Sequence, residues 1–454
     1  MDFLVTGADA ILTGRAGETA RASGSLRVRN GRIAEIGALS PDPGERIVDA
    51  SGCVVAPGLV NTHHHLFQSI LKAVPAGMNE ALAAWLRLVP YTYWDRLTGP
   101  LMETAAKVGM AELVLSGCTT IADHHYFYSD RYDFDPGGIL FDMADRFGIR
   151  FVLCRGGATK ARAFDSAQIT PLPTETLDTM IAAVERDAKR WHDPAPGAMR
   201  RVVMAPTTPT FSLQEHELKE IAAAARALGL RLHSHLSENM DYVNHTTGLY
   251  GKRPVEWLAG HDWLGPDVWF AHLVECTPDE VKLLAETGTG MAHCPQANAR
   301  LGSGVAPAPL LHAMGGAVSL AVDGAGANEA ADMASALHAA FSIHRATGGV
   351  TATTAETVLH WATAGGARVL GMEAIGTLEP GKAADIVLFD LNSPRYFGQH
   401  DRAIAPVISG GDMRVRHSFV AGKPLVENGR IPWLDLDALG AEALAAVRTI
   451  ARQA

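Results

Sequence analysis

Three short motifs, far apart in the sequence, carry side chains that could build a catalytic metal site. In chain order they supply His63 and His65, His235, and Asp323. Three imidazoles and one carboxylate can hold a divalent metal, and a site that keeps one further position open for water is catalytic rather than structural. The sequence therefore predicts metal-assisted attack by water on a bound substrate.

The first two candidate ligands are His63 and His65, which follow Pro57-Gly58 and an apolar run. Residues two apart on a strand place their side chains on one side, so both imidazoles can reach one ion while His64 points the other way. A lone histidine at such a place would more often be structural. The pair, together with the other candidate ligands, favours metal binding.

Two further residues are candidates for moving protons near this site. Glu238 lies three residues after His235, where its carboxyl group would reach the reacting centre and act as general acid or base. The alternative is that Glu238 begins the next helix and interacts with its dipole. His272 closes the apolar segment Val268-Trp-Phe-Ala-His and is expected within the site, although not necessarily as a metal ligand.

Asp323 ends a largely apolar run and precedes Gly324. A buried carboxylate costs free energy unless it is paired or bound to a metal. We expect Asp323 to bind the metal, to accept a proton from the attacking water, or to do both. The fourth candidate strand, Arg201-Val-Val-Met-Ala-Pro206, has no lysine from which a bridging carbamate could form, so we expect one metal ion.

The central part of the chain must bring these residues to one face. Helical patterns separate apolar segments that are typical of strands, and there are eight such segments: 59–65, 119–123, 150–155, 202–206, 231–235, 268–272, 290–294 and 319–323. This alternation predicts an α/β fold with a (β/α)8 TIM-like barrel, whose catalytic face lies at the carboxyl ends of the strands. An open doubly wound sheet is the alternative, but no Gly-x-Gly-x-x-Gly sequence opens a helix.

Both ends of the chain have a different texture, with short alternating strands and tight turns. Asn30-Gly31 is a strong hairpin signal, and 384–390 and 415–420 are typical of strands. We therefore expect a small β-sandwich from residues 1–56 and 376–435, a barrel from 57–375, and a C-terminal helix over 436–454.

The connection from residue 67 to about residue 98 is unusually long and contains Trp85, Tyr91, Tyr93 and Trp94. Loops of this length in a compact domain are functional or disordered. One interpretation is a lid whose aromatic rings stack on a planar ligand. The other is a surface loop packed by its own aromatic side chains.

Composition excludes several classes of protein. The chain has 454 residues, 47% of them hydrophobic, and a net charge of −10 without blocks of like charge, so neither a nucleic-acid partner nor a membrane span is expected. No secretion signal is recognisable at the N-terminus. Five cysteines, an odd number without a Cys-x-x-Cys pair, are typical of free thiols in the reducing cytoplasm.

Together these motifs resemble the amidohydrolase superfamily, in particular its mononuclear aromatic-amine deaminases. The similarity covers nearly the whole chain and includes Gly376-Thr-Leu-Glu-Pro-Gly-Lys-Ala-Ala-Asp-Ile-Val. The resemblance implies one Zn²⁺, with Fe²⁺ or Mn²⁺ as alternatives, bound by the four ligands named above. It also implies that Glu238 protonates a ring nitrogen, that His272 orients the water, and that Asp323 passes the water proton to the leaving amine.

Finer similarity is to isoxanthopterin deaminases and 8-oxoguanine deaminases, through His63-His-His-Leu-Phe-Gln68 and Asp323-Gly-Ala-Gly-Ala-Asn-Glu. It implies a small heterocyclic substrate, a fused aminopyrimidinone such as isoxanthopterin, and is compatible with a homodimer. The expected substrate contacts are Gln68, Arg155, Trp94, Gln296 and Asn298, although Arg155 could instead pair with a nearby carboxylate. Three alternatives stay open: an 8-oxoguanine deaminase, a triazine or alkylamine hydrolase, and an inactive scaffold barrel.

Overall fold

Eight parallel strands form the centre of the fold. In the computed structural model, which describes residues 2–162, 170–411 and 413–452, each strand pairs with the next strand in the sequence. The strands are β8 (Leu59–His64), β9 (Cys118–His125), β10 (Arg150–Arg155), β11 (Arg200–Met204), β12 (Leu232–Leu236), β13 (Val268–His272), β14 (Gly290–His293) and β15 (Ala317–Leu320). All eight lie where the apolar segments predict them, which confirms the barrel.

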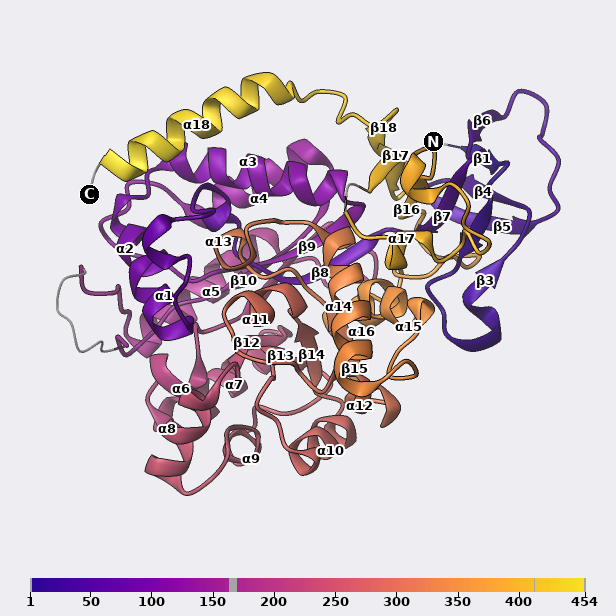
Figure 1. Ribbon diagram of the computed structural model, residues 1–454. Helices are drawn as coiled ribbons and strands as arrows, with labels where there is room; N and C mark the ends of the chain where they lie inside the picture. Colours follow the sequence, from indigo (N-terminus) through magenta and orange to yellow (C-terminus); the bar gives the residue numbers. More distant parts are fainter. Residues whose placement is uncertain (1, 163–169, 412, 453–454) are drawn as a thin grey trace.

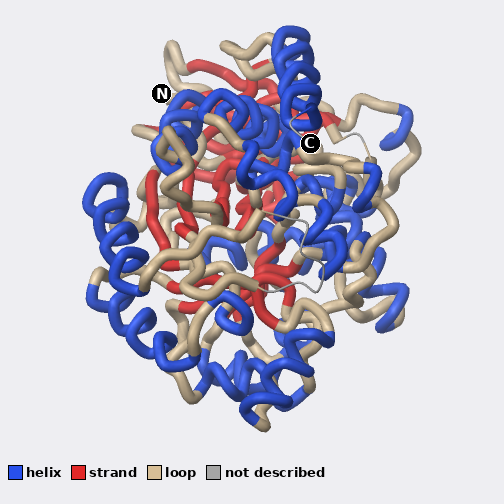
Figure 2. Tube along the Cα trace, turned by 90° about the vertical axis from the view of Figure 1, so that its left-hand side faces the viewer, coloured by secondary structure: helices blue, strands red, loops and turns tan. Residues whose placement is uncertain are grey.

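The last strand returns to the first. Just beyond β15, the backbone N–H of Asp323 donates to the carbonyl oxygen of His63 (3.1 Å), and the hydroxyl groups of Thr62 and Ser319 lie 2.7 Å apart. Helices surround the strands, as Figures 1 and 2 show. They include α3 (Gly99–Leu115), α4 (Pro136–Phe147), α5 (Leu177–Trp191), α7 (Leu218–Ala227), α8 (Met240–Tyr250), α9 (Pro254–Ala259), α10 (Pro278–Thr287), α12 (Ala308–Ala313), α14 (Met333–Gly348), α15 (Ala355–His360) and α16 (Gly366–Leu370).

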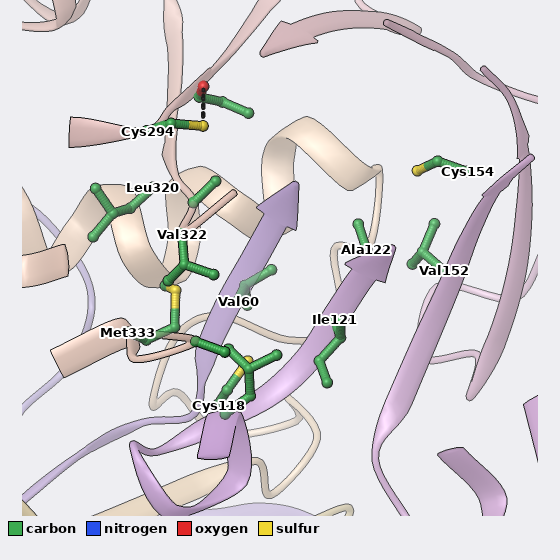
Figure 3. Close-up of a cluster of buried hydrophobic side chains, with 14 of the residues drawn as sticks. Val60, Cys118, Ile121, Ala122, Val152, Cys154, Cys294, Leu320, Val322 and Met333 are labelled. Atoms are coloured by element: carbon green, nitrogen blue, oxygen red, sulfur yellow. Dashed lines mark hydrogen bonds between the residues drawn. The ribbon is translucent and has the colours of Figure 1, made fainter. Parts of the chain in front are cut away.

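Apolar side chains fill the interface between these strands and helices. Figure 3 shows part of this core. Val60 from β8, Ile121 from β9 and Val152 from β10 lie in one cluster with Leu320, the last residue of β15, and Val322. Each of these side chains is almost completely buried. Burial on both faces explains why the barrel strands are near-continuous apolar runs rather than alternating ones.

The two ends of the chain meet in two further sheets, beside the barrel in Figure 1. One has the order β5-β4-β1-β6 and the other β18-β17-β16-β7-β2-β3. Their strands are β1 (Phe3–Thr6), β2 (Ala10–Leu12), β3 (Arg21–Ala22), β4 (Ser25–Arg29), β5 (Arg32–Gly37), β6 (Arg46–Asp49), β7 (Cys53–Pro57), β16 (Ile386–Asp390), β17 (Arg414–Val420) and β18 (Lys423–Glu427). A separate apolar core lies between the sheets, as in a sandwich; the exact domain limits stay a prediction.

A buried ion pair ties the sandwich to the barrel. Arg150, the first residue of β10, contacts both carboxylate oxygens of Asp385 at 2.7 and 3.0 Å. Asp385 also accepts the backbone N–H of Ala421 (2.8 Å), and Arg150 donates to the carbonyl oxygen of Gly197. These hydrogen bonds pair the two buried charges at the amino-terminal end of the barrel strands, opposite the end that carries the candidate ligands.

The aromatic-rich connection after β8 is folded rather than irregular. It forms short helices that include α1 (Leu82–Leu88) and α2 (Pro90–Tyr93). The C-terminal helix α18 (Leu436–Arg452) lies along α3, where Glu442 pairs with Lys107 (2.8 Å). Within the described residues, every helix is too short or too polar to cross a membrane.

Candidate active site and metal centre

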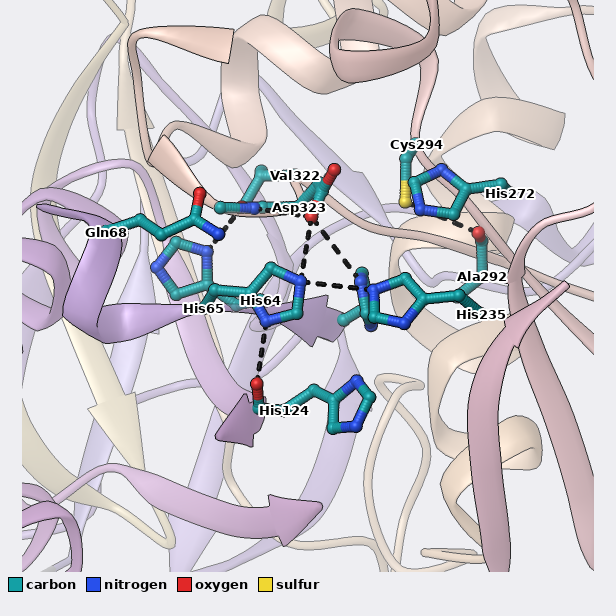
Figure 4. A network of polar contacts seen from close by, with 12 residues as sticks. His64, His65, Gln68, His124, His235, His272, Ala292, Cys294, Val322 and Asp323 are labelled. Atoms are coloured by element: carbon teal, nitrogen blue, oxygen red, sulfur yellow. Dashed lines mark hydrogen bonds and ion pairs between the residues drawn. The ribbon is translucent and has the colours of Figure 1, made fainter. Parts of the chain in front are cut away.

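The strand tips bring the four predicted metal ligands together. Nε2 of His235 lies 3.2 Å from Nε2 of His65, and Oδ1 of Asp323 lies 3.3 Å from Nε2 of His65 and 3.4 Å from Nε2 of His63. In a tetrahedral zinc site with bonds of about 2.0–2.1 Å, ligand atoms are about 3.3–3.4 Å apart. These three separations are therefore of the size expected between ligands of one zinc ion, and Figure 4 shows how three of the side chains, His65, His235 and Asp323, converge from different parts of the chain.

Backbone carbonyls fix the orientation of two of these imidazoles. Nδ1 of His65 donates to the carbonyl oxygen of His124, and Nδ1 of His235 donates to that of Thr207, both at 2.7 Å. A carbonyl oxygen only accepts, so each ring has its proton on Nδ1 and keeps the lone pair of Nε2 for the site. His64 points away as predicted, with Nδ1 bonded to the carbonyl oxygen of Asp323 (2.5 Å).

Asp323 is held in the ionised form by its neighbours. Burial works to raise the pKa of this carboxyl group, but the imidazoles of His63 and His65, whose Nε2 atoms lie 3.4 and 3.3 Å from Oδ1, outweigh burial and hold the pKa well below its ordinary value. The backbone of Asp323 is left-handed (φ 62°), and so is that of His272 (φ 75°). Such conformations cost free energy in non-glycine residues and are common at active sites, where they aim a side chain.

Glu238 and His272 lie beside the ligands. Nε2 of His272 is 3.6 Å from Oε2 of Glu238. Burial raises the pKa of Glu238 to about 7, with His272 acting in the opposite direction. A carboxyl group with this pKa is partly protonated at neutral pH and can donate as well as accept a proton.

Asn298 orients His272 instead of lining the cavity. Its Oδ1 accepts from Nδ1 of His272 at 2.9 Å, which leaves Nε2 of His272 facing the site with a lone pair. Asn298 belongs to α11 (Pro295–Arg300) and is buried behind the histidine. The sequence placed Asn298 near the site but gave no indication of this partner.

A narrow cavity is lined by three of the four candidate ligands, His65, His235 and Asp323. Its volume is about 30 Å³, and its walls include the predicted residues Gln68, Glu238 and His272. Gln68 donates from Nε2 to the hydroxyl of Tyr126 (3.3 Å), whereas Oε1 is buried without a hydrogen-bond partner in the described part of the chain. That oxygen is therefore ready to accept a hydrogen bond from a bound molecule.

Two aromatic residues of the long connection cover the cavity. Trp85 and Tyr91 line it, and the indole N–H of Trp85 donates to the carbonyl oxygen of Gly326 (3.1 Å). Trp94 does not line the cavity: it packs against Phe127 and donates to the carbonyl oxygen of Thr170 (3.4 Å). Some rings of the connection thus face the cavity, whereas others pack among themselves; the stacking of rings on a planar ligand stays a prediction.

Arg155 and Gln296 also lie away from the cavity walls. Arg155 contacts both carboxylate oxygens of Glu175 at 2.5 and 2.7 Å, which is the alternative that the sequence left open. Its guanidinium lies 3.8 Å from the centre of the Tyr128 ring. Gln296 is half-buried on α11.

Several wall residues were not predicted from the sequence. They are Leu82, Leu86, Tyr126, Arg162, Thr207, Thr208 and Tyr242. Arg162 lies in an irregular segment without any periodic pattern, so nothing in the sequence singled it out. His124 was missed as well, although its ring nitrogens join those of His63, His65 and His235 in one buried group; the signal was its place at the end of the second barrel strand.

Comparison with known proteins places this architecture among characterised enzymes. Residues 54–425 match the amidohydrolase family. The chain is 48% identical to an isoxanthopterin deaminase from an unknown prokaryotic organism, over 99% of this chain and 97% of that protein. It is 37% identical to 8-oxoguanine deaminase from Pseudomonas aeruginosa, over 94% and 95% of the two chains. The crystal structure of atrazine chlorohydrolase from Arthrobacter aurescens complexed with zinc superimposes with a TM-score of 0.90 at 27% identity, over 98% of this chain and 100% of the other.

Proposed function

We propose that this chain, which belongs to the amidohydrolase family, is a zinc-dependent deaminase of a fused aminopyrimidinone. The proposed substrate is isoxanthopterin. The reaction adds water to isoxanthopterin and releases ammonia, leaving 7-oxylumazine. The observation that carries the proposal is the close approach of three imidazoles and a carboxylate, at separations typical of zinc ligands, beside a cavity that the protonatable Glu238 lines.

The donor set supports zinc over a hard cation. His63, His65 and His235 would supply nitrogen and Asp323 oxygen, a combination that suits zinc, whereas magnesium and calcium prefer oxygen ligands. When bound, the metal polarises water and makes it a nucleophile near neutral pH. Fe²⁺ and Mn²⁺ remain the alternatives for the same ligands.

The remaining steps are proton transfers by residues that already face the cavity. The oxygen of water forms a bond to the ring carbon that carries the amine, and Glu238 donates its proton to the adjacent ring nitrogen. Nε2 of His272, held by Asn298, accepts a hydrogen bond from the water and orients it. Asp323, ionised before attack, takes one proton from the water and delivers it to the amine, which leaves as ammonia when the C–N bond breaks. The remaining hydroxyl proton passes to Glu238 as the carbonyl forms, which restores the protonated glutamate.

The cavity wall supports a flat substrate with both N–H and carbonyl groups. Oε1 of Gln68 needs a donor, and a lactam N–H of the pyrimidinone ring would provide one. Arg162 is a donor on the same wall, and its guanidinium would recognise a carbonyl of the second ring. Trp85 and Tyr91 would stack on the ring faces.

A second candidate substrate is 8-oxoguanine. Its fused ring system has the same amino-bearing carbon and also a carbonyl on the second ring, but the second ring is smaller. The 37% identity to an 8-oxoguanine deaminase supports this second candidate.

Ammonia release from zinc-loaded protein tests the proposal. The panel contains isoxanthopterin, pterin, 8-oxoguanine, guanine and isocytosine, and the Glu238→Gln variant controls for contaminating activity. We expect the highest kcat/KM for isoxanthopterin. A higher value for 8-oxoguanine would overturn the substrate and keep the mechanism, and ammonia from no compound of the panel would overturn the proposed function.

A further inference from the structure

His233 lies directly beneath the candidate metal centre and has no role in the proposed reaction. It belongs to β12, two residues before His235, and is completely buried. Its ring stacks on Trp269 of the neighbouring strand, with ring centres 4.5 Å apart and planes 20° from parallel. The ring is therefore held in one place by its surroundings.

The hydrogen bonds of His233 fix where its proton lies. Nδ1 lies 3.1 Å from the carbonyl oxygen of Trp269, which can only accept. Nδ1 of His233 therefore carries a hydrogen. A buried imidazole with only a carbonyl and another imidazole as partners is uncharged, because burial without a counter-ion disfavours the charged form. Its Nε2 must then be the acceptor.

That acceptor faces His63. Nε2 of His233 lies 2.8 Å from Nδ1 of His63, so the hydrogen between the two rings belongs to His63. With the hydrogen on Nδ1, Nε2 of His63 has its lone pair directed at the site, where it lies 3.4 Å from Oδ1 of Asp323. This nitrogen has no hydrogen-bond partner within the described residues, as expected for an atom that binds a metal.

His63 differs in this respect from the other two histidine ligands. The Nδ1 atoms of His65 and His235 are held by backbone carbonyls, whereas Nδ1 of His63 is held by a side chain. Trp269, on which His233 stacks, also bonds to the strand that carries His63. Its indole N–H donates to the carbonyl oxygen of Thr62, the residue before His63 (3.2 Å). Residues from strands β8, β12 and β13 thus together hold the imidazole of His63 in one orientation.

We propose that His233 is a positioning residue of the metal centre, which accepts the Nδ1 hydrogen of His63 and so presents Nε2 of His63 to the ion. Groups that orient metal ligands in this way typically change metal affinity by 10- to 100-fold when they are removed. The inference rests on the proposed metal centre but is independent of the substrate.

Two variants of similar size separate the hydrogen bond from packing. His233→Gln keeps an oxygen that can accept from His63, whereas His233→Met fills similar space with only a weak acceptor. His293→Met is the control for loss of a buried barrel histidine, since His293 bonds to His344 and does not line the cavity. The measurements are the zinc dissociation constant by chelator competition, the visible spectrum of the Co²⁺ form, and the melting temperature of the metal-free protein.

We expect His233→Met to weaken zinc binding about 10- to 100-fold and to alter the Co²⁺ spectrum, and His233→Gln to recover most of both. His293→Met should leave both close to wild type. Equal zinc affinities for the Met and Gln variants would overturn the proposal, as would an unchanged Co²⁺ spectrum in His233→Met. If metal-free His233→Met does not fold, His233→Phe, whose ring can stack on Trp269, replaces it with the same expectation. Failure of the wild-type protein to bind zinc would instead contradict the metal centre itself.

Discussion

The backbone N–H of Asp323 donates to the carbonyl oxygen of His63 at 3.1 Å. This hydrogen bond connects the segment after the last barrel strand to the first barrel strand, and it also links two proposed metal ligands. Oδ1 of the same aspartate lies 3.4 Å from Nε2 of the same histidine. Barrel closure and ligand spacing are therefore coupled. A change that loosens one should loosen the other.

Metal removal should affect both activity and stability. The ligands come from strands β8 and β12 and from the segment after β15, so a bound ion would hold the barrel together. We expect chelation to abolish ammonia release and lower the melting temperature. At a free zinc concentration 100 times Kd, binding stabilises the protein by about 2.7 kcal/mol. Differential scanning fluorimetry and an ammonia assay measure the two effects, and Zn²⁺ but not Mg²⁺ should restore them. Full activity in thoroughly chelated protein would contradict the metal centre.

Glu238→Gln should separate metal binding from turnover. The side chain faces the cavity beside His272, and it is not one of the four converging ligands. An amide cannot donate and regain a proton as a carboxyl group does, so kcat should fall by about 10²- to 10⁴-fold. Zinc content measured by atomic emission should be unchanged. Near-normal kcat in this variant would remove Glu238 from its role.

Arg162→Met should change substrate preference. If the guanidinium donates to the carbonyl of the second ring, kcat/KM for isoxanthopterin should fall about 10- to 100-fold, the equivalent of one charged hydrogen bond. Pterin lacks that carbonyl and should be affected much less. The matched variant is Arg155→Met, whose arginine pairs with Glu175 away from the cavity and should affect stability rather than preference. An equal loss for both substrates in Arg162→Met would argue against recognition of the carbonyl.

Trp85→Phe should change how the cavity opens. The substitution keeps an aromatic ring over the cavity but removes the hydrogen bond from Trp85 to Gly326. A neutral hydrogen bond contributes about 0.5–1.5 kcal/mol, so the open form should gain up to about tenfold in population and KM should rise. Trp94→Phe is the control, because its indole bonds to Thr170 outside the cavity wall. Identical kinetics for the two variants would mean that Trp85 does not hold the connection after β8 over the cavity.

The buried ion pair between Arg150 and Asp385 should be important for stability. Both side chains are at most 2% exposed, so Arg150→Met leaves a buried carboxylate without its counter-charge and should cost about 3–5 kcal/mol. Arg190 and Asp135 form an exposed pair, and Arg190→Met should cost less than about 1 kcal/mol. Denaturant unfolding measures both. A small effect of Arg150→Met would mean that water reaches Asp385.

The sequence predicted the barrel and the four converging side chains because both depend on local patterns. Apolar runs mark the strands, and His63 and His65 share a side through alternation alone. The choice between Trp85 and Trp94, by contrast, depends on how short helices pack, which no periodicity records. Arg162 follows no pattern, and the pairing of Asn298 with His272 joins helix α11 to the end of strand β13, whose approach only the folded barrel defines.

The cavity beside the candidate ligands is narrow. A space of about 30 Å³ accommodates about two water molecules, far less than a two-ring heterocycle requires. Binding of the proposed substrate therefore requires the side chains that line the cavity, Trp85 and Tyr91 among them, to move apart. Entry of the substrate and release of the ring product would both depend on movement of the connection that carries these two residues.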